Sequence, residues 1–237
     1  MKQSRYREIV EAVALQQKLL AVLVDPEQFQ PELAAMFLTQ IPKETTHLFV
    51  GGSSVPNGLT ALVVESLKKH TNKPIVLFPG DASQITPQAD ALLFLSLLSG
   101  RNPEYLIGQQ VKAIPAIKKS NLEIIATGYL LIDGGNSSAV ARVTGTEPMA
   151  QHEVQLIVDT AKAGELLGAK LIYLEAGSGA AFPVSEEIIR AVKKELTIPL
   201  IVGGGIRTEA QKKKAYDAGA DMVVMGTVFE QAMKNAQ

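Results

Sequence analysis

Eight short and almost unbroken apolar runs recur along the chain, and they constrain its fold more than any other feature. A strand buried on both faces gives such a run, and parallel sheets bury both faces of their strands. Amphipathic stretches between most of the runs predict helices, so the pattern indicates repeated βαβ units. The runs lie at residues 19–25, 47–52, 74–80, 91–98, 122–128, 170–177, 199–205 and 221–227.

The number of runs and the length of the chain favour a closed barrel. Eight such units in 237 residues match an α/β fold, the (β/α)8 TIM barrel, which typically has about 250 residues. A doubly wound open sheet is the competing fold, but no GxGxxG follows the first run. The segment DASQITPQA (81–89) is too short and too broken by proline for a full helix. We therefore expect one domain over residues 1–237, a modified barrel whose third helix is replaced by a loose segment.

Composition limits what the protein binds. The net charge of −1 gives no overall field that would steer the chain to nucleic acid. The absence of cysteine excludes disulfides and thiolate catalysis, and it leaves oxygen or histidine as metal ligands. The apolar runs are far shorter than the ~20 residues of a membrane span. We expect a cytoplasmic protein with no transmembrane segment and no nucleic-acid partner.

Glycines gather where the last three strands are expected to end. They lie in Gly177-Ser178-Gly179, in Gly203–Gly205 and in Gly226-Thr227. Barrel enzymes place their sites at the carboxyl ends of the strands, and phosphate commonly binds after the last two. Glycine lets backbone amides approach an anion closely, and a helix N-terminus adds free N–H groups. These clusters predict a phosphate ligand, with turns that merely require glycine as the alternative.

Glu175 lies two residues before the first of these glycines. Side chains alternate along a strand, so Tyr173 and Glu175 point to the same side. If that side is the barrel interior, the carboxylate lies beside the phosphate rather than on it. It could then orient a ligand hydroxyl and take its proton. The alternative is that Glu175 only caps a loop.

Polar residues also follow the first three runs. Asp25 ends the first run, where a carboxylate could bind Mg²⁺ or simply form a turn before Pro26. Ser53, in the sequence GGSS (51–54), could place a hydroxyl near a phosphate or a metal, or cap a helix. Asp81 is a weaker candidate for the same role.

An apolar groove is expected beside the loose third segment. Residues 128–140 are rich in glycine and serine, and we expect them to form a long functional loop. Ordinary core packing is the alternative explanation for the apolar residues near this side. These residues are Phe78, Phe94, Leu95, Leu97, Leu98, Tyr105, Tyr129 and Leu131.

The motifs VDP, GGSS, YLEAGSG, GGGIR and GT occur in this order over nearly the whole chain. Together they resemble the geranylgeranylglyceryl phosphate synthase family, which includes bacterial heptaprenylglyceryl phosphate synthases. The resemblance implies a TIM barrel without its third helix and a Mg²⁺-dependent prenyltransferase (EC 2.5.1.41) of ether lipid synthesis. Such an enzyme joins a prenyl diphosphate to the 3-hydroxyl of sn-glycerol 1-phosphate and releases pyrophosphate. It also implies a homo-oligomer, a dimer or a hexamer, with transient membrane contact through the lipid product.

Carried onto this chain, the resemblance implies that Asp25 and Ser53 bind the metal and that Glu175 engages the hydroxyls of glycerol phosphate. Bacterial heptaprenyl enzymes carry a lysine where this chain has Leu23, which favours geranylgeranyl diphosphate as the substrate. The alternatives are heptaprenyl diphosphate, a different phosphate-binding barrel enzyme such as an isomerase or aldolase, and a non-catalytic sensor. Glycerol phosphate would bind at Tyr173, Leu174, Glu175, Ala176, Gly177, Ser178, Gly179, Gly204, Gly205, Gly226 and Thr227.

Overall fold

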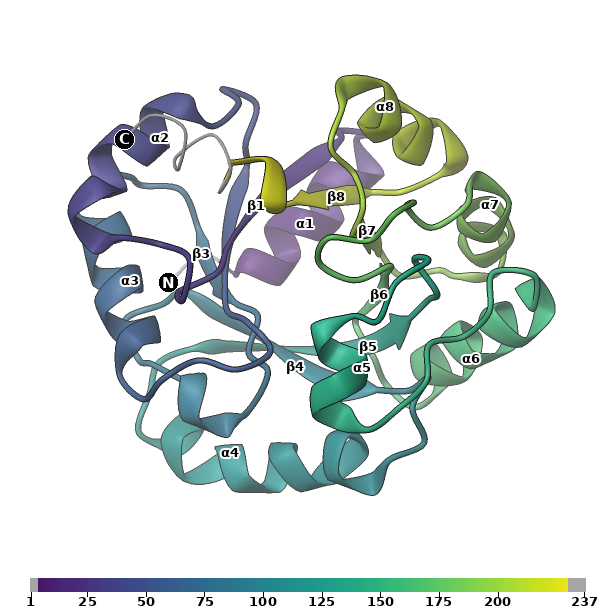
Figure 1. Cartoon of the computed structure of the whole chain (residues 1–237), viewed down its shortest axis with the longest axis horizontal. Helices are drawn as coiled ribbons and strands as arrows, with labels where there is room; N and C mark the ends of the chain where they lie inside the picture. The colour runs from purple at the N-terminus through teal and green to yellow at the C-terminus, as the bar shows by residue number, and fades with distance from the viewer. Residues whose placement is uncertain (1–3, 230–237) are drawn as a thin grey trace.

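The computed structural model describes residues 4–229, and its eight parallel strands close into a barrel. Each strand pairs with the next one in the sequence, and β8 pairs with β1 to complete the ring. Figure 1 looks into this ring. The expected TIM barrel is confirmed. The strands are β1 (Leu19–Val24), β2 (His47–Val50), β3 (Ile75–Leu77), β4 (Ala91–Leu97), β5 (Glu123–Leu131), β6 (Leu171–Glu175), β7 (Leu200–Gly203) and β8 (Met222–Met225).

Helices surround the barrel, with an interruption after β3. There the chain forms only the 3-10 turn η2 (Ala82–Gln84), as the loose segment predicted, and Figure 1 shows the gap between α3 and α4. A π-helical turn, η3 (Glu104–Gly108), leads into α4, and the 3-10 turn η1 (Pro31–Leu33) leads into α2. Within residues 4–229 no helix is long and apolar enough to cross a bilayer. The helices are α1 (Arg5–Ala14), α2 (Ala34–Gln40), α3 (Leu59–Lys68), α4 (Gln109–Lys118), α5 (Ala139–Thr144), α6 (Val154–Leu166), α7 (Glu186–Glu195) and α8 (Glu209–Ala218).

The segment expected to be a long loop at 128–140 is partly regular. Strand β5 continues to Leu131 because its last residues pair with β6 and are buried. The helix α5 then begins after Ser138, whose hydroxyl accepts a hydrogen bond from the Ala141 N–H. The expectation of a loop over this whole stretch is wrong. The sequence also predicts a short terminal helix in VFEQAMK (228–234), and most of this segment lies outside the described residues.

The buried side chains form an inner and an outer layer. Along β6, Tyr173 packs inside the barrel with Phe49 and Ile201, whereas Leu174 packs outside with Ile188 and other residues of the surrounding helices. This alternation is what the period of two in a strand dictates. It also sends Glu175 to the same side as Tyr173.

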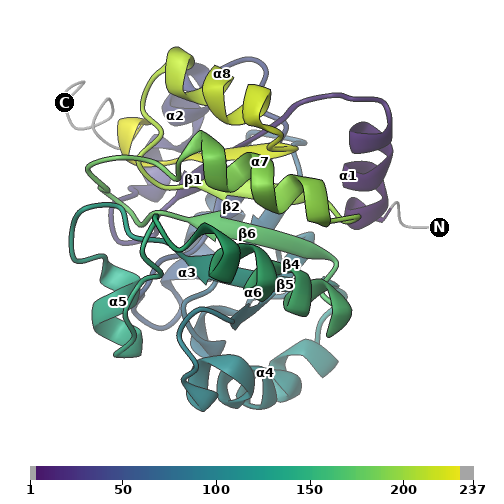
Figure 2. The ribbon, with the colours of Figure 1, turned by 90° about the vertical axis from the view of Figure 1, so that its right-hand side faces the viewer.

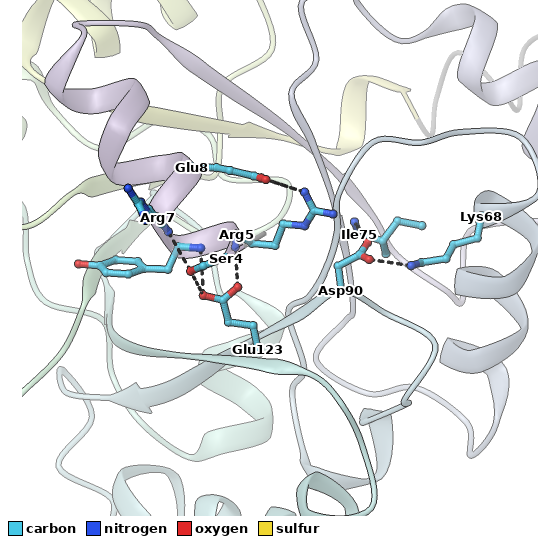
Figure 3. Close-up of polar contacts among 9 residues, drawn as sticks. Ser4, Arg5, Arg7, Glu8, Lys68, Ile75, Asp90 and Glu123 are labelled. Carbon is cyan, nitrogen blue, oxygen red and sulfur yellow. Dashed lines mark hydrogen bonds and ion pairs between the residues drawn. The ribbon is translucent and has the colours of Figure 1, made fainter. Parts of the chain in front are cut away.

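Helix α1 covers the amino-terminal end of the barrel, away from α5 at the other end (Figure 2). Glu123, the first residue of β5, accepts hydrogen bonds from the Arg5 N–H (2.5 Å) and the Ser4 hydroxyl (2.6 Å), as Figure 3 shows. It also accepts one from the Tyr6 N–H (3.2 Å). The first amides of a helix have no partner within the helix, and the helix dipole favours a negative charge there. The carboxylate therefore fastens α1 across this end of the barrel.

Replacing Glu123 with alanine is expected to lower the free energy of unfolding by about 2 kcal/mol, because hydrogen bonds to charged groups contribute roughly that much. Urea denaturation measures the change. The control is Glu147→Ala, since Glu147 is exposed and such surface changes stay within about 0.5 kcal/mol. Equal effects of the two substitutions would show that the contact does not stabilise α1.

Candidate active site

A cavity of about 280 Å³ opens at the carboxyl ends of the strands. One side of it is polar and includes Asp25, Ser53 and Glu175, with glycines of the loops after β6 and β7. The other side is apolar and includes Phe78 and Tyr129. Pockets with an apolar lining and a few placed polar groups bind small molecules. This one suits a ligand with a charged head and an apolar tail.

Glu175 ends β6 and lines the cavity, although its side chain is only 6% exposed. Burial raises the pKa of Glu175 from 4.5 to about 7. The nearby Tyr173 hydroxyl, which lies outside good hydrogen-bond geometry, and the Gly177 N–H oppose this shift because they favour the charged carboxylate. A carboxyl group with a pKa near 7 exchanges its proton readily at neutral pH, as a general base requires.

Glu175 also caps a loop. Its Oε1 accepts a hydrogen bond of 2.7 Å from the Gly177 N–H. The sequence left loop capping and contact with a ligand as alternatives. Since the same carboxylate both binds Gly177 and lines the cavity, the two roles are compatible.

Gly204 brings the loop after β7 against this carboxylate. A Cβ at Gly204 would lie 2.4 Å from Oε1 of Glu175 and 2.6 Å from the Gly177 nitrogen, and its φ is +79°. Only glycine tolerates this approach and this backbone conformation together. The loops after β6 and β7 thus pack backbone to backbone, and their residues form one end of the cavity.

The residues predicted to bind glycerol phosphate divide into two groups. Leu174 and Ala176 turn their side chains to the outer core. The Ala176 N–H bonds the Gly203 carbonyl (3.0 Å), and the Gly177 N–H is held by Glu175. The other predicted residues line the cavity, namely Tyr173, Glu175, Ser178, Gly179, Gly204, Gly205, Gly226 and Thr227.

Asp25 and Ser53, the predicted metal ligands, line the same polar side. A Cβ on Gly52 would lie 2.9 Å from Oδ1 of Asp25, so the loop that carries Ser53 packs against this carboxylate. Oδ1 of Asp25 accepts the Glu27 N–H at 3.0 Å, and burial is the main cause that raises the pKa of Asp25.

A complete metal cage is absent from residues 4–229, since no three histidine, aspartate or glutamate side chains cluster there. One carboxylate and one hydroxyl nevertheless fit Mg²⁺, which typically binds one or two protein carboxylates, several waters and the phosphates of a substrate. The donors at Asp25 and Ser53 match a metal that arrives with, or is shared by, a phosphorylated ligand.

The apolar side contains most of the predicted groove. Phe78 stacks on Tyr173 with ring centroids 5.1 Å apart and contacts Tyr129 at 5.8 Å. Leu98 and Leu131 do not line the cavity. Leu98 lies past the end of β4 and packs in the outer core. The groove residues that line the cavity as expected are Phe78, Phe94, Leu95, Leu97, Tyr105 and Tyr129.

Several cavity residues were not predicted from the sequence. Many of them come from α4 and α5, which lie beside the apolar side, and no motif marks them. Leu23 also lines the cavity, where it contacts Gly226; a Cβ on that glycine would lie 3.2 Å from the Leu23 Cβ. The residues from the two helices are Gln109, Gln110, Ala113, Ala139, Val140, Val143 and Thr144.

A model of the PcrB family matches residues 13–237 of the chain. The chain is 57% identical to geranylgeranylglyceryl phosphate synthase from Zunongwangia profunda over 222 residues, which cover 94% of this chain and 95% of that protein. It is 42% identical to the protein of the same name from Thermococcus kodakarensis over 219 residues, which cover 91% and 86% of the two chains.

A solved structure has the same fold. It is the crystal structure of (S)-3-O-geranylgeranylglyceryl phosphate synthase from Thermoplasma acidophilum in complex with sn-glycerol-1-phosphate. The TM-score is 0.89 at 33% identity, and the match covers 97% of this chain and 92% of that one.

The raised pKa of Glu175 predicts a pH-dependent stability. Because the folded-state pKa is about 7 against an ordinary 4.5, its contribution to the free energy of unfolding is greatest below pH 4.5. It is lost as the pH rises through 7. Glu175→Gln removes the buried charge. From pH 4 to pH 8, the free energy of unfolding of the variant should rise by about 3 kcal/mol relative to that of wild type. Denaturation at both pH values measures this difference.

The exposed Glu147 provides the control for this measurement. Glu147→Gln should show the same difference from wild type at both pH values. If Glu175→Gln also differs from wild type by the same amount at both pH values, ionisation of the Glu175 carboxyl does not destabilise the folded protein.

Proposed function

Because the chain belongs to the PcrB family, we propose that it is a prenyltransferase, a geranylgeranylglyceryl phosphate synthase. It joins geranylgeranyl diphosphate to the 3-hydroxyl of sn-glycerol 1-phosphate and releases pyrophosphate. The relatives described above carry this name at 42% and 57% identity over most of both chains. The related structure from Thermoplasma acidophilum has sn-glycerol-1-phosphate bound.

The position of Glu175 is the observation that supports this reaction best. Its carboxyl lies where the polar and apolar sides of the cavity meet, close to Tyr173, which stacks on Phe78. On one side are the glycines of the loops after β6 and β7, which suit a phosphate ester. On the other side is the groove, which suits an isoprenoid. A hydroxyl of the polar substrate and the first carbon of the prenyl chain would meet beside this carboxyl.

The chain's own groups account for attack by the hydroxyl. The backbone around Ser178, Gly179, Gly204 and Gly205 holds the phosphate of glycerol phosphate, so the free hydroxyl is directed toward Glu175. Fixing both reactants in one cavity lowers the entropic part of the barrier. The hydroxyl oxygen bonds to the prenyl carbon as the bond from that carbon to the diphosphate oxygen breaks. Glu175 accepts the hydroxyl proton, and pyrophosphate leaves.

Asp25 and Ser53 would hold Mg²⁺ at the diphosphate end of the cavity. When bound, such an ion acts as a Lewis acid that neutralises the phosphate oxygens of the leaving group. Asp25 suits this role because its carboxylate lies at the end of β1 against the loop of Ser53.

The C20 chain is favoured over the C35 heptaprenyl chain. The relatives carry the name of the geranylgeranyl enzyme, and Leu23 stands in the cavity where heptaprenyl enzymes carry lysine. An isomerase or aldolase would need a second acid or base, or a Schiff-base lysine, at a strand end. Lys170 precedes β6 at the opposite end of the barrel and lies over the Tyr6 ring at 5.2 Å.

We further propose a cytoplasmic homo-oligomer that meets the membrane only when it delivers its lipid product. The sequence predicts that the apolar region of Val140, Met149 and Leu156 contributes to the contact between subunits. Val140 lines the cavity and Met149 is buried, so Leu156 on α6, at 45% exposure, is the one of the three open to a partner.

A direct assay tests the reaction. Purified protein is incubated with Mg²⁺, sn-glycerol 1-phosphate and prenyl diphosphates of increasing length, and products are identified by mass spectrometry. We expect an ether-linked geranylgeranyl product and less product from heptaprenyl diphosphate. Tight binding of glycerol phosphate with no product from any diphosphate would instead identify a sensor.

Glu175→Gln is expected to lower kcat by about 100-fold or more, because the amide cannot accept the proton. The KM for sn-glycerol 1-phosphate should change by no more than a few-fold, since the backbone groups remain. In wild type, kcat/KM should fall below about pH 7, where the carboxyl is protonated. Glu147→Gln is the control, with wild-type rates. A kcat within a few-fold of wild type in Glu175→Gln would rule out the base.

A further inference from the structure

Gln84 is a buried polar side chain in the segment that replaces the third helix. It lies at the end of η2 and is 2% exposed. Burying an amide without partners is costly, and Gln84 has partners on another loop. Its Nε2 donates to the Gly52 carbonyl at 2.8 Å, and its Oε1 accepts from the Gly52 N–H at 3.3 Å.

These two hydrogen bonds replace the partner that a neighbouring strand would supply. The Gly51 N–H still bonds the Val24 carbonyl (3.2 Å), in continuation of the pairing between β1 and β2. Gly52 has left the sheet, and the Gln84 amide binds both its N–H and its carbonyl, as a peptide group of a paired strand does. The loop of residues 51–54, here called the GGSS loop, is therefore held from the side of η2.

The GGSS loop is also held by close packing on the backbone after β3. A Cβ on Gly80 would lie 2.5 Å from the Gly52 oxygen and 2.7 Å from the Ser53 oxygen. Side chains are excluded from this contact, so the position of Gly52 depends on backbone packing and on the Gln84 amide. Asp25 also lies against Gly52.

The turn that carries Gln84 is itself anchored. Asp81 caps it by accepting the Ser83 N–H at 2.7 Å. Oε1 of Gln109, on α4, accepts the Ala82 N–H at 3.0 Å. The short segment after β3 thus links α4 to the GGSS loop through defined hydrogen bonds, and Gln84 is the last residue in that series of contacts.

We propose that Gln84 is a positioning residue, which fixes the GGSS loop so that Ser53 and the adjacent Asp25 can receive the diphosphate end of the prenyl substrate. The inference rests on the proposed function for the identity of that substrate. Gln84 itself does not line the cavity, so it acts through Gly52. The glycines after β6, β7 and β8 belong to other loops, and their site for glycerol phosphate does not depend on Gln84.

The test compares Gln84→Met with Gln88→Met. Methionine keeps the length of the side chain and removes both hydrogen bonds. Gln88 lies in the same segment but is exposed and bonds the Glu65 side chain at 3.1 Å, away from the GGSS loop. The first measurement is amide hydrogen exchange of the GGSS loop, which needs neither substrate nor activity. We expect faster exchange, by about tenfold at Gly52, in Gln84→Met alone.

The second measurement separates the two substrates. Two lost hydrogen bonds of about 1 kcal/mol each correspond to roughly a tenfold or larger loss of affinity. In Gln84→Met, the KM for geranylgeranyl diphosphate and the Kd for Mg²⁺ with inorganic pyrophosphate should rise by that factor. The KM for sn-glycerol 1-phosphate should stay within twofold, and Gln88→Met should match wild type throughout. An equal rise for both substrates, or no rise for either, would overturn the proposal.

A second variant covers the case in which Gln84→Met does not fold. Gln84→Glu keeps an oxygen to accept the Gly52 N–H but places a second acceptor against the Gly52 carbonyl. It should show the same selective loss toward diphosphate, and wild-type behaviour in this variant would contradict the inference. If wild type makes no ether product, the proposed function fails by itself. The exchange experiment then still decides whether Gln84 holds the loop.

Discussion

Closure of eight parallel strands is the constraint on which the rest of the structure depends. Once β8 pairs with β1, every strand must send alternate side chains inward. Along β6 this rule places Tyr173 inside, Leu174 outside and Glu175 inside. The carboxyl at the last position of the strand therefore lies above the core and faces the cavity, although removing it from water costs free energy.

That cost explains the chemistry of the site. A glutamate surrounded by apolar and aromatic groups holds its proton more tightly, and its pKa moves to about 7. The Gly177 N–H limits the shift by binding the charged form. A neutral or half-ionised acid also repels a neighbouring phosphate less than a permanently charged one. The proposed phosphate-binding site, which contains no lysine, is thus compatible with a carboxylate nearby in the same cavity.

The sequence predicted the strands well because their residues are apolar on both faces, and each strand was placed to within three residues at both ends, although β5 was predicted to end too early, at Gly128. That end was missed because Gly128 and the later glycines suggested a loop, whereas Leu130 and Leu131 pair with β6. Most candidate site residues could be found because glycines and acids at strand ends are local signals. The orientation of Leu98 and the hydrogen bonds of Gln84 to Gly52 could not be found, since both depend on contacts with distant segments.

The missing helix after β3 has a consequence for the size of the molecule a barrel can process. A closed ring of helices confines a ligand to the space above the sheet, which is set by eight strands and cannot grow. Where one helix is reduced to the turn η2, the apolar side of the cavity opens over this segment and α4, through Ala82, Ile85, Gln109 and Ala113. In the proposed reaction, an isoprenoid longer than the barrel radius would lie along this opening. A few side chains along the opening, rather than a new strand or subunit, would then set the preferred lipid length.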